Sequence, residues 1–175
     1  GCKVASMSIS GSAGEEITAS FEIIAQDSQS RAAALTSSFG SGKQMFHFEC
    51  GNLSYSGNSF AMKSFEFTLD NKLERRNVVS DVKDVTLSVT LEMEDNLLFD
   101  NFIAGTQSDA VFTLTNSDGD ACEITIRNAY VVDYDDPINT FGPIERSMTF
   151  VGESDAVDEA IQIKITNQQA SAVAN

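Results

Sequence analysis

The clearest hydrophobic pattern in the chain lies between Asp84 and Gly105. Hydrophobic and polar residues alternate there with a period of two as far as Met93, which is typical of a strand with one buried face. After Asp95 the spacing of the hydrophobic residues becomes helical. Asp95 is suited to cap the first turn of a helix, and Gly105 suits the left-handed residue that follows one. The pattern predicts a strand that leads into one helix at about residues 95–104. The hydrophobic face of the strand is Val85, Leu87, Val89, Leu91 and Met93.

Most other segments show the same alternation and are separated by residues typical of turns. A first hairpin is predicted from residues 2–10 and 17–24, joined by a glycine-containing turn at 11–14. The second of these strands places Ile17, Ala19, Phe21 and Ile23 on one face. Residues 60–69 predict a strand with a bulge near Lys63, because the register of its hydrophobic positions changes there.

Further short strands are predicted at 45–50, 110–114, 122–134, 144–150 and 161–165, whereas 51–58 has the composition of a turn. Asp118-Gly119 is a strong hairpin signal. About nine or ten strands with one helix favour a mainly β fold. We therefore expect an antiparallel β-sandwich or barrel with one flanking helix.

A chain of 175 residues suits a single domain, which we expect to extend over residues 1–167. Long loops are predicted at 27–42 and 70–83. The first of these is either a functional excursion or a disordered insertion. The second is too long for a tight hairpin, so we expect it to project from the domain. Residues 168–175 predict a flexible tail.

The formal net charge of −15 argues against nucleic-acid binding through a broad basic patch. It fits a well-solvated surface, or a surface that must not adhere to polyanions. The three cysteines, Cys2, Cys50 and Cys122, are far apart and predict buried free thiols in a reducing compartment. Since no run of about 18 apolar residues exists, we expect no membrane span. The chain begins at Gly1 within a strand-like segment, so we expect a trimmed or processed N-terminus.

The sequence offers little catalytic chemistry. Its one histidine, His47, lies in a short Phe-flanked segment, and the chain has no GxSxG motif or zinc-ligand spacing. Asp118–Asp120 lacks the ligand spacing of a calcium loop, and Gly40–Lys43 does not complete a phosphate-binding loop. We expect a structural or interaction protein, with no enzymatic activity, metal or cofactor.

The order of these elements resembles the major tail tube protein of long-tailed bacteriophages. The stretch Phe65–Glu74, the strand Val85–Met93 and the helical run Asp95–Gly105 are similar to motifs of that family. The late run from Ala129 to Gly152 also resembles its C-terminal half. The similarity is best over residues 60–166. Residues 27–42 match no motif of the family.

This resemblance implies a subunit that forms hexameric rings, and these rings stack into a hollow tube, as in the related tubes of contractile tails and type VI secretion. It implies a virion protein of the phage tail, assembled in the host cytoplasm. The expected partners are other copies of the chain, other tail proteins at the tube ends, and genomic DNA that passes through without specific binding. The projecting loop, with Asn71, Lys72, Arg75 and Arg76, is implied to contact a neighbouring subunit. The candidate lumen face is Glu66, Thr68, Thr86, Ser88, Thr90 and Glu92.

Two other functions are compatible with the residues alone. A monomeric β-sandwich that binds a ligand or a carbohydrate would need exposed aromatic platforms, for which Tyr55, Tyr130 and Tyr134 are available. A hydrolase would need His47. The candidate lumen face could also be an ordinary solvent-exposed face, and the loop at 70–83 a flexible one.

Overall fold

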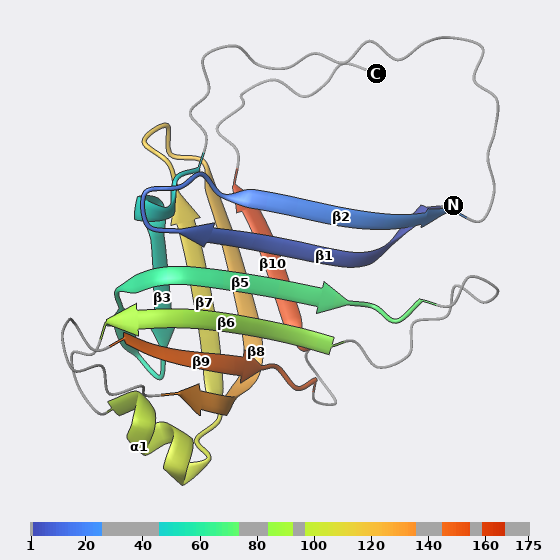
Figure 1. Ribbon diagram of the computed structural model, residues 1–175. Helices are drawn as coiled ribbons and strands as arrows, with labels where there is room; N and C mark the ends of the chain where they lie inside the picture. Colours follow the sequence, from blue (N-terminus) through green and yellow to red (C-terminus); the bar gives the residue numbers. More distant parts are fainter. Residues whose placement is uncertain are drawn as a thin grey trace, which may run out of the picture.

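Two antiparallel sheets form the body of the molecule in the computed structural model, which describes residues 2–25, 46–73, 84–92, 97–135, 145–154 and 159–166. The first sheet has the order β2 (Thr18–Ala25), β1 (Cys2–Ser12), β5 (Met62–Asp70), β6 (Asp84–Glu92), β9 (Glu145–Val151) and the end of β8 (Ala121–Asp135). The second has the order β10 (Ile161–Thr166), β8, β7 (Ser108–Thr115), β3 (Gly51–Tyr55) and β4 (Asn58–Phe60). In Figure 1 the strands of the second sheet cross behind those of the first. The predicted β-sandwich is confirmed, and the sheet does not close into a barrel.

β8 belongs to both layers and joins them. Its first half pairs with β7 and β10, whereas Tyr130–Asp135 pairs with β9. Between these halves Asn128 has a positive φ of 46°, and the pairing with β7 changes register. A local irregularity of this kind bends a strand, which lets one strand pass from one sheet to the other.

The core lies between the two sheets and follows the predicted alternation. On β6 the residues Val85, Leu87, Val89 and Leu91 are all buried, and the residues between them reach solvent. Phe65 and Phe67 of β5 extend this apolar layer, and Phe112 of β7 packs against Phe65 at a ring distance of 4.3 Å. The register shift at Met62/Ser64 confirms the predicted bulge beside Lys63.

The helix α1 (Leu97–Ala104) lies against β8 at one end of the sandwich (Figure 1). Gly105 has a φ of +60°. Its N–H donates to Phe102 O, and the N–H of Thr106 donates to Asn101 O, a pair of bonds that ends helices in a left-handed residue. The predicted helix and its glycine stop are confirmed, whereas the predicted cap, Asp95, lies outside the described residues. Within the described ranges, no helix has the length and apolarity that a membrane crossing requires.

Two local predictions are wrong. Phe48–Cys50 is a turn of 3-10 helix, η1, and not part of a strand. It places the ring of Phe48 against Phe65, where burial of the ring outweighs the weak alternation of the segment. Residues 51–58 are not a long turn, because Gly51–Tyr55 forms β3 and only Ser56 and Gly57, both with positive φ, turn the chain into β4.

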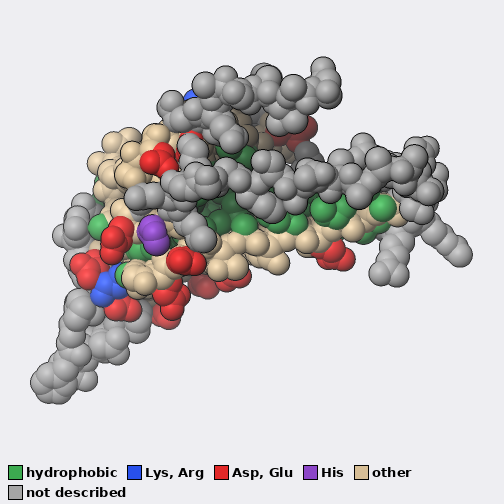
Figure 2. All heavy atoms as spheres, turned by 90° about the horizontal axis from the view of Figure 1, so that it is seen from above, with side chains coloured by type: hydrophobic (Ala, Val, Ile, Leu, Met, Phe, Trp, Pro, Cys, Tyr) green, Lys and Arg blue, Asp and Glu red, His purple; other side chains and the backbone are tan. Residues whose placement is uncertain are grey.

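The hairpin of β1 and β2 is present as predicted, but the hydrophobic face of β2 is largely uncovered. Phe21 and Ile23 are 57% and 61% exposed. Figure 1 shows the reason: the second sheet crosses behind one half of the first, and the hairpin continues beyond β10. In Figure 2 hydrophobic side chains follow this projecting hairpin in a row. The cysteine prediction is also wrong in part, because Cys2 is exposed and Cys122 only half-buried.

Candidate functional site

All six residues of the candidate lumen face lie together on the outer face of the first sheet. β5 and β6 pair so that Glu66 lies opposite Ser88 and Thr68 opposite Thr86. Each of the four alternates along its strand with a buried hydrophobic residue of the core. The hydrophobic layer therefore fixes which side chains point outward, and it aligns them into a single surface.

This surface extends over all the strands of the first sheet and is larger than the sequence indicated. We define the polar face as the six predicted residues together with their cross-strand neighbours of matching orientation. These neighbours are Ser6, Ser8 and Ser10 of β1, Thr18, Ser20 and Glu22 of β2, Ser64 of β5, Glu145, Ser147 and Thr149 of β9, and Asp133 and Asp135 of β8. The alternate serines of β1 were a signal in the sequence, but their place beside β5 depends on long-range pairing.

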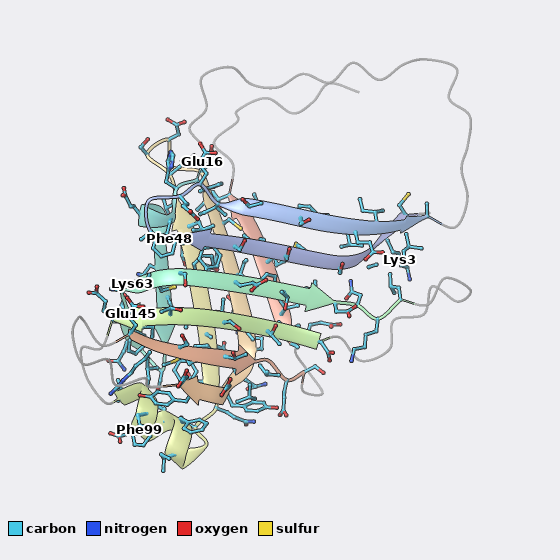
Figure 3. The ribbon with its side chains drawn as sticks, in the orientation of Figure 1. Lys3, Glu16, Phe48, Lys63, Phe99 and Glu145 are labelled. Carbon is cyan, nitrogen blue, oxygen red and sulfur yellow. The ribbon has the colours of Figure 1, made fainter. Side chains whose placement is uncertain are left out.

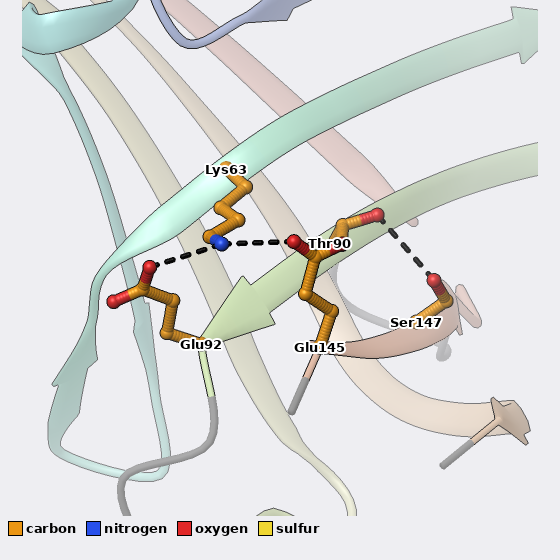
Figure 4. Close-up of polar contacts among 5 residues, drawn as sticks. All are labelled: Lys63, Thr90, Glu92, Glu145 and Ser147. Carbon is orange, nitrogen blue, oxygen red and sulfur yellow. Dashed lines mark hydrogen bonds and ion pairs between the residues drawn. The ribbon is translucent and has the colours of Figure 1, made fainter. Parts of the chain in front are cut away.

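Hydroxyl groups hydrogen-bond to one another across the strands of the polar face. Thr68 and Thr86 share a short hydrogen bond between their Oγ1 atoms. Ser88 Oγ lies 3.1 Å from Thr149 Oγ1. Figure 4 shows the next pair, in which Thr90 Oγ1 lies 3.4 Å from Ser147 Oγ. Cross-strand pairs of this type stabilise a sheet. They also leave the hydroxyls partly satisfied, so the face is wettable without being a preformed ligand site.

The polar face is hollowed at two places. The larger hollow has a volume of about 510 Å³ and lies toward the Gly11 turn. Its carboxylates are Glu15, Glu16, Glu66, Asp133 and Asp135. A second hollow of about 400 Å³ lies toward the other end, and Glu22 and Asp70 are its acidic residues. Because both hollows carry carboxylates and hydroxyls, the concave surface is anionic and repels phosphate.

Lys63 reaches this face from the bulge in β5, and two carboxylates bind it. Its Nζ donates to Glu145 Oε1 at 2.8 Å and lies 3.0 Å from Glu92 Oε1 (Figure 4). Figure 3 shows Lys63 and Glu145 at the same end of the first sheet as Glu16. The hydrogen bonds to Glu145 and Glu92 raise the pKa of Lys63 above its ordinary value. The cation is therefore neutralised locally and is not presented to a polyanion.

Replacing Lys63 by glutamine should lower the urea midpoint of unfolding at neutral pH. Glu92 and Glu145 lie directly opposite each other in the β6–β9 register, so without Lys63 two like charges face one another. The loss should shrink in high salt. Because the folded pKa of Lys63 is raised, its contribution is complete below the ordinary lysine pKa and is lost as the pH rises through the raised one. A protein that keeps Lys63 should show that alkaline step, and the Lys63→Gln variant should not. Lys164→Gln on the exposed strand β10 removes the same charge and serves as the control.

The candidate inter-subunit loop begins with residues that bind their own chain. Asn71 donates from its backbone N–H to Ala5 O at 2.8 Å and from Nδ2 to Val4 O at 2.9 Å. Lys72 Nζ lies 2.5 Å from Asp84 Oδ2. These contacts tie the ends of β5 and β6 to each other and to β1. Arg75 and Arg76 lie outside the described residues.

Among the described residues, the three tyrosines do not together form the aromatic platform that a carbohydrate-binding module would need. Tyr55 is fully buried, and its hydroxyl lies 2.7 Å from Thr106 O and 3.2 Å from Ala129 O. Burial raises the pKa of Tyr55, as expected for a phenol inside the core. Tyr134 stacks on Phe102 of α1 at a ring distance of 5.6 Å. Of the three tyrosines, two are thus part of the packing.

His47 is exposed and pairs through its backbone with Glu16. Within the described ranges, no group of three or more His, Cys, Asp or Glu side chains is placed to hold a metal ion. The arrangement of the described residues can therefore present a surface, and we find no catalytic constellation among them.

The chain is similar to one protein family and to several solved structures. The family described as phage tail tube protein matches residues 1–166. No curated protein sequence matches the chain. Among solved structures, a chain of the anti-feeding prophage cap (AFP tube terminating cap) is 12% identical, with a TM-score of 0.52, over 77% of this chain and all of that one. A chain of the PVC sheath-tube complex, from an extracellular contractile injection system, is 13% identical, with a TM-score of 0.51, over 74% and 100%. Hcp1 from Flavobacterium johnsoniae is 14% identical, with a TM-score of 0.48, over 65% and 94%. At 12% and 13% identity, the likeness to the first two of these structures shows the fold alone.

Proposed function

Because the chain belongs to the phage tail tube protein family, we propose that its copies form hexameric rings, that the rings stack into a hollow tube, and that the polar face lines the lumen. Membership of the family makes the chain a structural tube subunit of the phage tail and not an enzyme. The proposal concerns how the subunits are oriented, how many form a ring, and what passes through the tube.

The observation that carries the orientation is the extent of the polar face. It crosses every strand of the first sheet, from Glu22 on β2 to Asp133 on β8, and it is concave. The opposite side of the same sheet is hydrophobic, and the second sheet covers it except along the projecting hairpin of β1 and β2. In a closed ring of such subunits, first sheets placed side by side would form one continuous concave wall. Edge strands, a liability in a monomer, would become joints between subunits.

The chemistry of this wall supports the passage of genomic DNA without specific binding. Duplex DNA binds proteins mainly through cations that neutralise its phosphates. The polar face presents hydroxyls and carboxylates, and its Lys63 is bound by Glu92 and Glu145. DNA in such a lumen would be repelled from the wall on all sides and would not adhere to it.

The loop at 70–83 is the second part of the proposal. Asn71 and Lys72 anchor its first residues to the domain, and Arg75 and Arg76 would carry positive charge to a neighbouring, acidic subunit. We also propose that other tail proteins bind the tube ends and that assembly takes place in the host cytoplasm. The sheath and the terminating cap named for the two similar structures are partners of this general kind, in those assemblies.

Electron microscopy of the purified protein tests the assembly. We expect stacked rings or hollow tubes, with six-fold symmetry in end-on views. A monomer at every concentration and salt condition, even with preformed tail ends added as an initiator, would contradict the proposal.

Cysteine protection tests which face lines the lumen. In a variant without the native cysteines, Ser88→Cys on the polar face and Ser117→Cys on the exposed β7–β8 turn should both react with a small maleimide. In assembled tubes, a polyethylene glycol maleimide too large for the lumen should label only the Ser117→Cys variant. Equal labelling of both variants in tubes would place the polar face outside.

A further inference from the structure

The hairpin of β1 and β2 carries hydrophobic side chains that nothing in the described part of the chain covers. Val4, Phe21 and Ile23 are 37%, 57% and 61% exposed, and we call them the hairpin strip. Val4 lies directly opposite Ile23, and Phe21 opposite the buried Met7, so the strip continues the core face of the first sheet. It thus continues the inner layer of the sandwich beyond the second sheet (Figure 1).

The two faces of this hairpin have opposite chemistry. On the other face Ser6 Oγ donates to Glu22 Oε2 at 3.3 Å, and Ser20 lies beside Ser8. Figure 2 shows the row of hydrophobic side chains along the projecting hairpin, with acidic side chains below it. A pair of strands with one uncovered hydrophobic face is marginally stable in water and usually needs a covering layer.

Charge indicates what covers the strip. The chain carries a formal net charge of −15, so two copies repel each other through most of their surfaces. The hairpin strip, with Ala19 beside it, is an uncharged surface, because Glu22 and Lys3 alternate onto the opposite face. A contact between like-charged copies is least costly where neither charge nor hydration must be given up.

The place of the strip in the fold points to the same occupant. β2 is an edge strand, hydrogen-bonded only to β1 within the described part of the chain. A subunit that meets this edge can pair with β2 and at the same time cover the strip. Exposed edges with an adjoining apolar face are typical sites of association between chains.

We propose that the hairpin strip is the docking surface for a neighbouring copy of this chain. The inference rests on the proposed tube and assigns the surface that holds its subunits together. Val4, Phe21 and Ile23 would be buried in the assembly, and the polar face of the same hairpin would remain in the lumen. The hairpin would then extend both the wall of the lumen and the hydrophobic layer behind it into the next subunit.

The test compares Phe21→Ser/Ile23→Ser with the control Thr18→Ala/Ser20→Ala, which changes the opposite face of the same strand. We expect the critical concentration for assembly of the first variant to rise at least about tenfold, because burial of even one large apolar side chain is worth such a factor. The control should assemble like the wild type. The conservative variant Phe21→Leu/Ile23→Val should restore assembly.

Thermal melting of the dilute, unassembled protein gives the second measurement. If a neighbouring copy covers the strip, the serine variant should melt at the wild-type temperature or above it. A fall of several degrees would mean that the chain's own residues, such as those between β2 and η1, cover the strip, and would overturn the inference. Unchanged assembly of the serine variant would overturn it too, while tubes of the wild type would leave the proposed function standing. A wild type that never forms rings or tubes would refute both.

Discussion

Replacing Phe150 by alanine should lower the free energy of unfolding by about 3–5 kcal/mol, the usual cost of removing a large aromatic side chain from a close-packed core. Phe150 is fully buried. On β9 it lies opposite Leu87 of β6 and Val131 of β8, and its ring is 5.0 Å from that of Tyr55 in the second sheet. The side chain therefore connects both layers at the point where β8 joins them. Urea denaturation followed by circular dichroism measures the change.

Phe21→Ala is the matched control, because it deletes the same ring from a side chain that is more than half exposed. In the unassembled protein we expect a change within about 0.5 kcal/mol, as for surface substitutions generally. Since domains are stable by only about 5–15 kcal/mol, the Phe150 variant would be close to its unfolding threshold, whereas the Phe21 variant would not. Similar losses in both variants would show that the strip belongs to the core of the single chain.

The strand β6 shows what the sequence could predict. Its alternation gave both the element and the buried face, because a period of two leaves only one way to bury four large aliphatic residues. The same logic failed at β3. Leu53 and Tyr55 share its buried face there, but Gly51, Asn52 and Ser54 give the segment the composition of a turn. Composition typical of turns was there outweighed by tertiary packing. It failed in the opposite direction at β2, whose hydrophobic face is real but lies beyond the layer that would cover it.

The polar face was predictable only strand by strand. The alternation of polar and hydrophobic residues along β5 and β6 was enough to place Glu66 and Ser88 on one surface, because these two strands pair directly. The contribution of β1 depends on its pairing with β5, across more than fifty residues of sequence. The ion pairs of Lys63 need Glu145, which is 82 residues away and is brought near by the β6–β9 register. No local pattern contains that information, since it arises from the order of strands in the sheet.

Lysines introduced into the polar face should convert the tube from a channel that DNA passes through into one that retains it. In Glu66→Lys/Thr90→Lys each subunit gains three units of positive charge on this face, and every ring repeats the gain. Linear duplex DNA should then be retained by assembled tubes at low salt. If about six to ten phosphates are neutralised, the affinity should fall by about 10³–10⁵ between 50 and 200 mM salt. Co-sedimentation of tubes with labelled DNA measures this, and wild-type tubes should retain none.

The shape of the DNA distinguishes a lumen from an outer surface. A closed circular duplex has no free end and cannot enter a narrow tube, so the Glu66→Lys/Thr90→Lys tubes should retain linear DNA and leave circular DNA in solution. The control, Ser117→Lys/Asp118→Lys, adds the same charge to the exposed β7–β8 turn and should bind both forms alike. Retention of circular DNA by the polar-face variant would place that face outside the tube. Retention of linear DNA alone would place the acidic, hydroxyl-rich face in the lumen, where repulsion from every side keeps the DNA free to move.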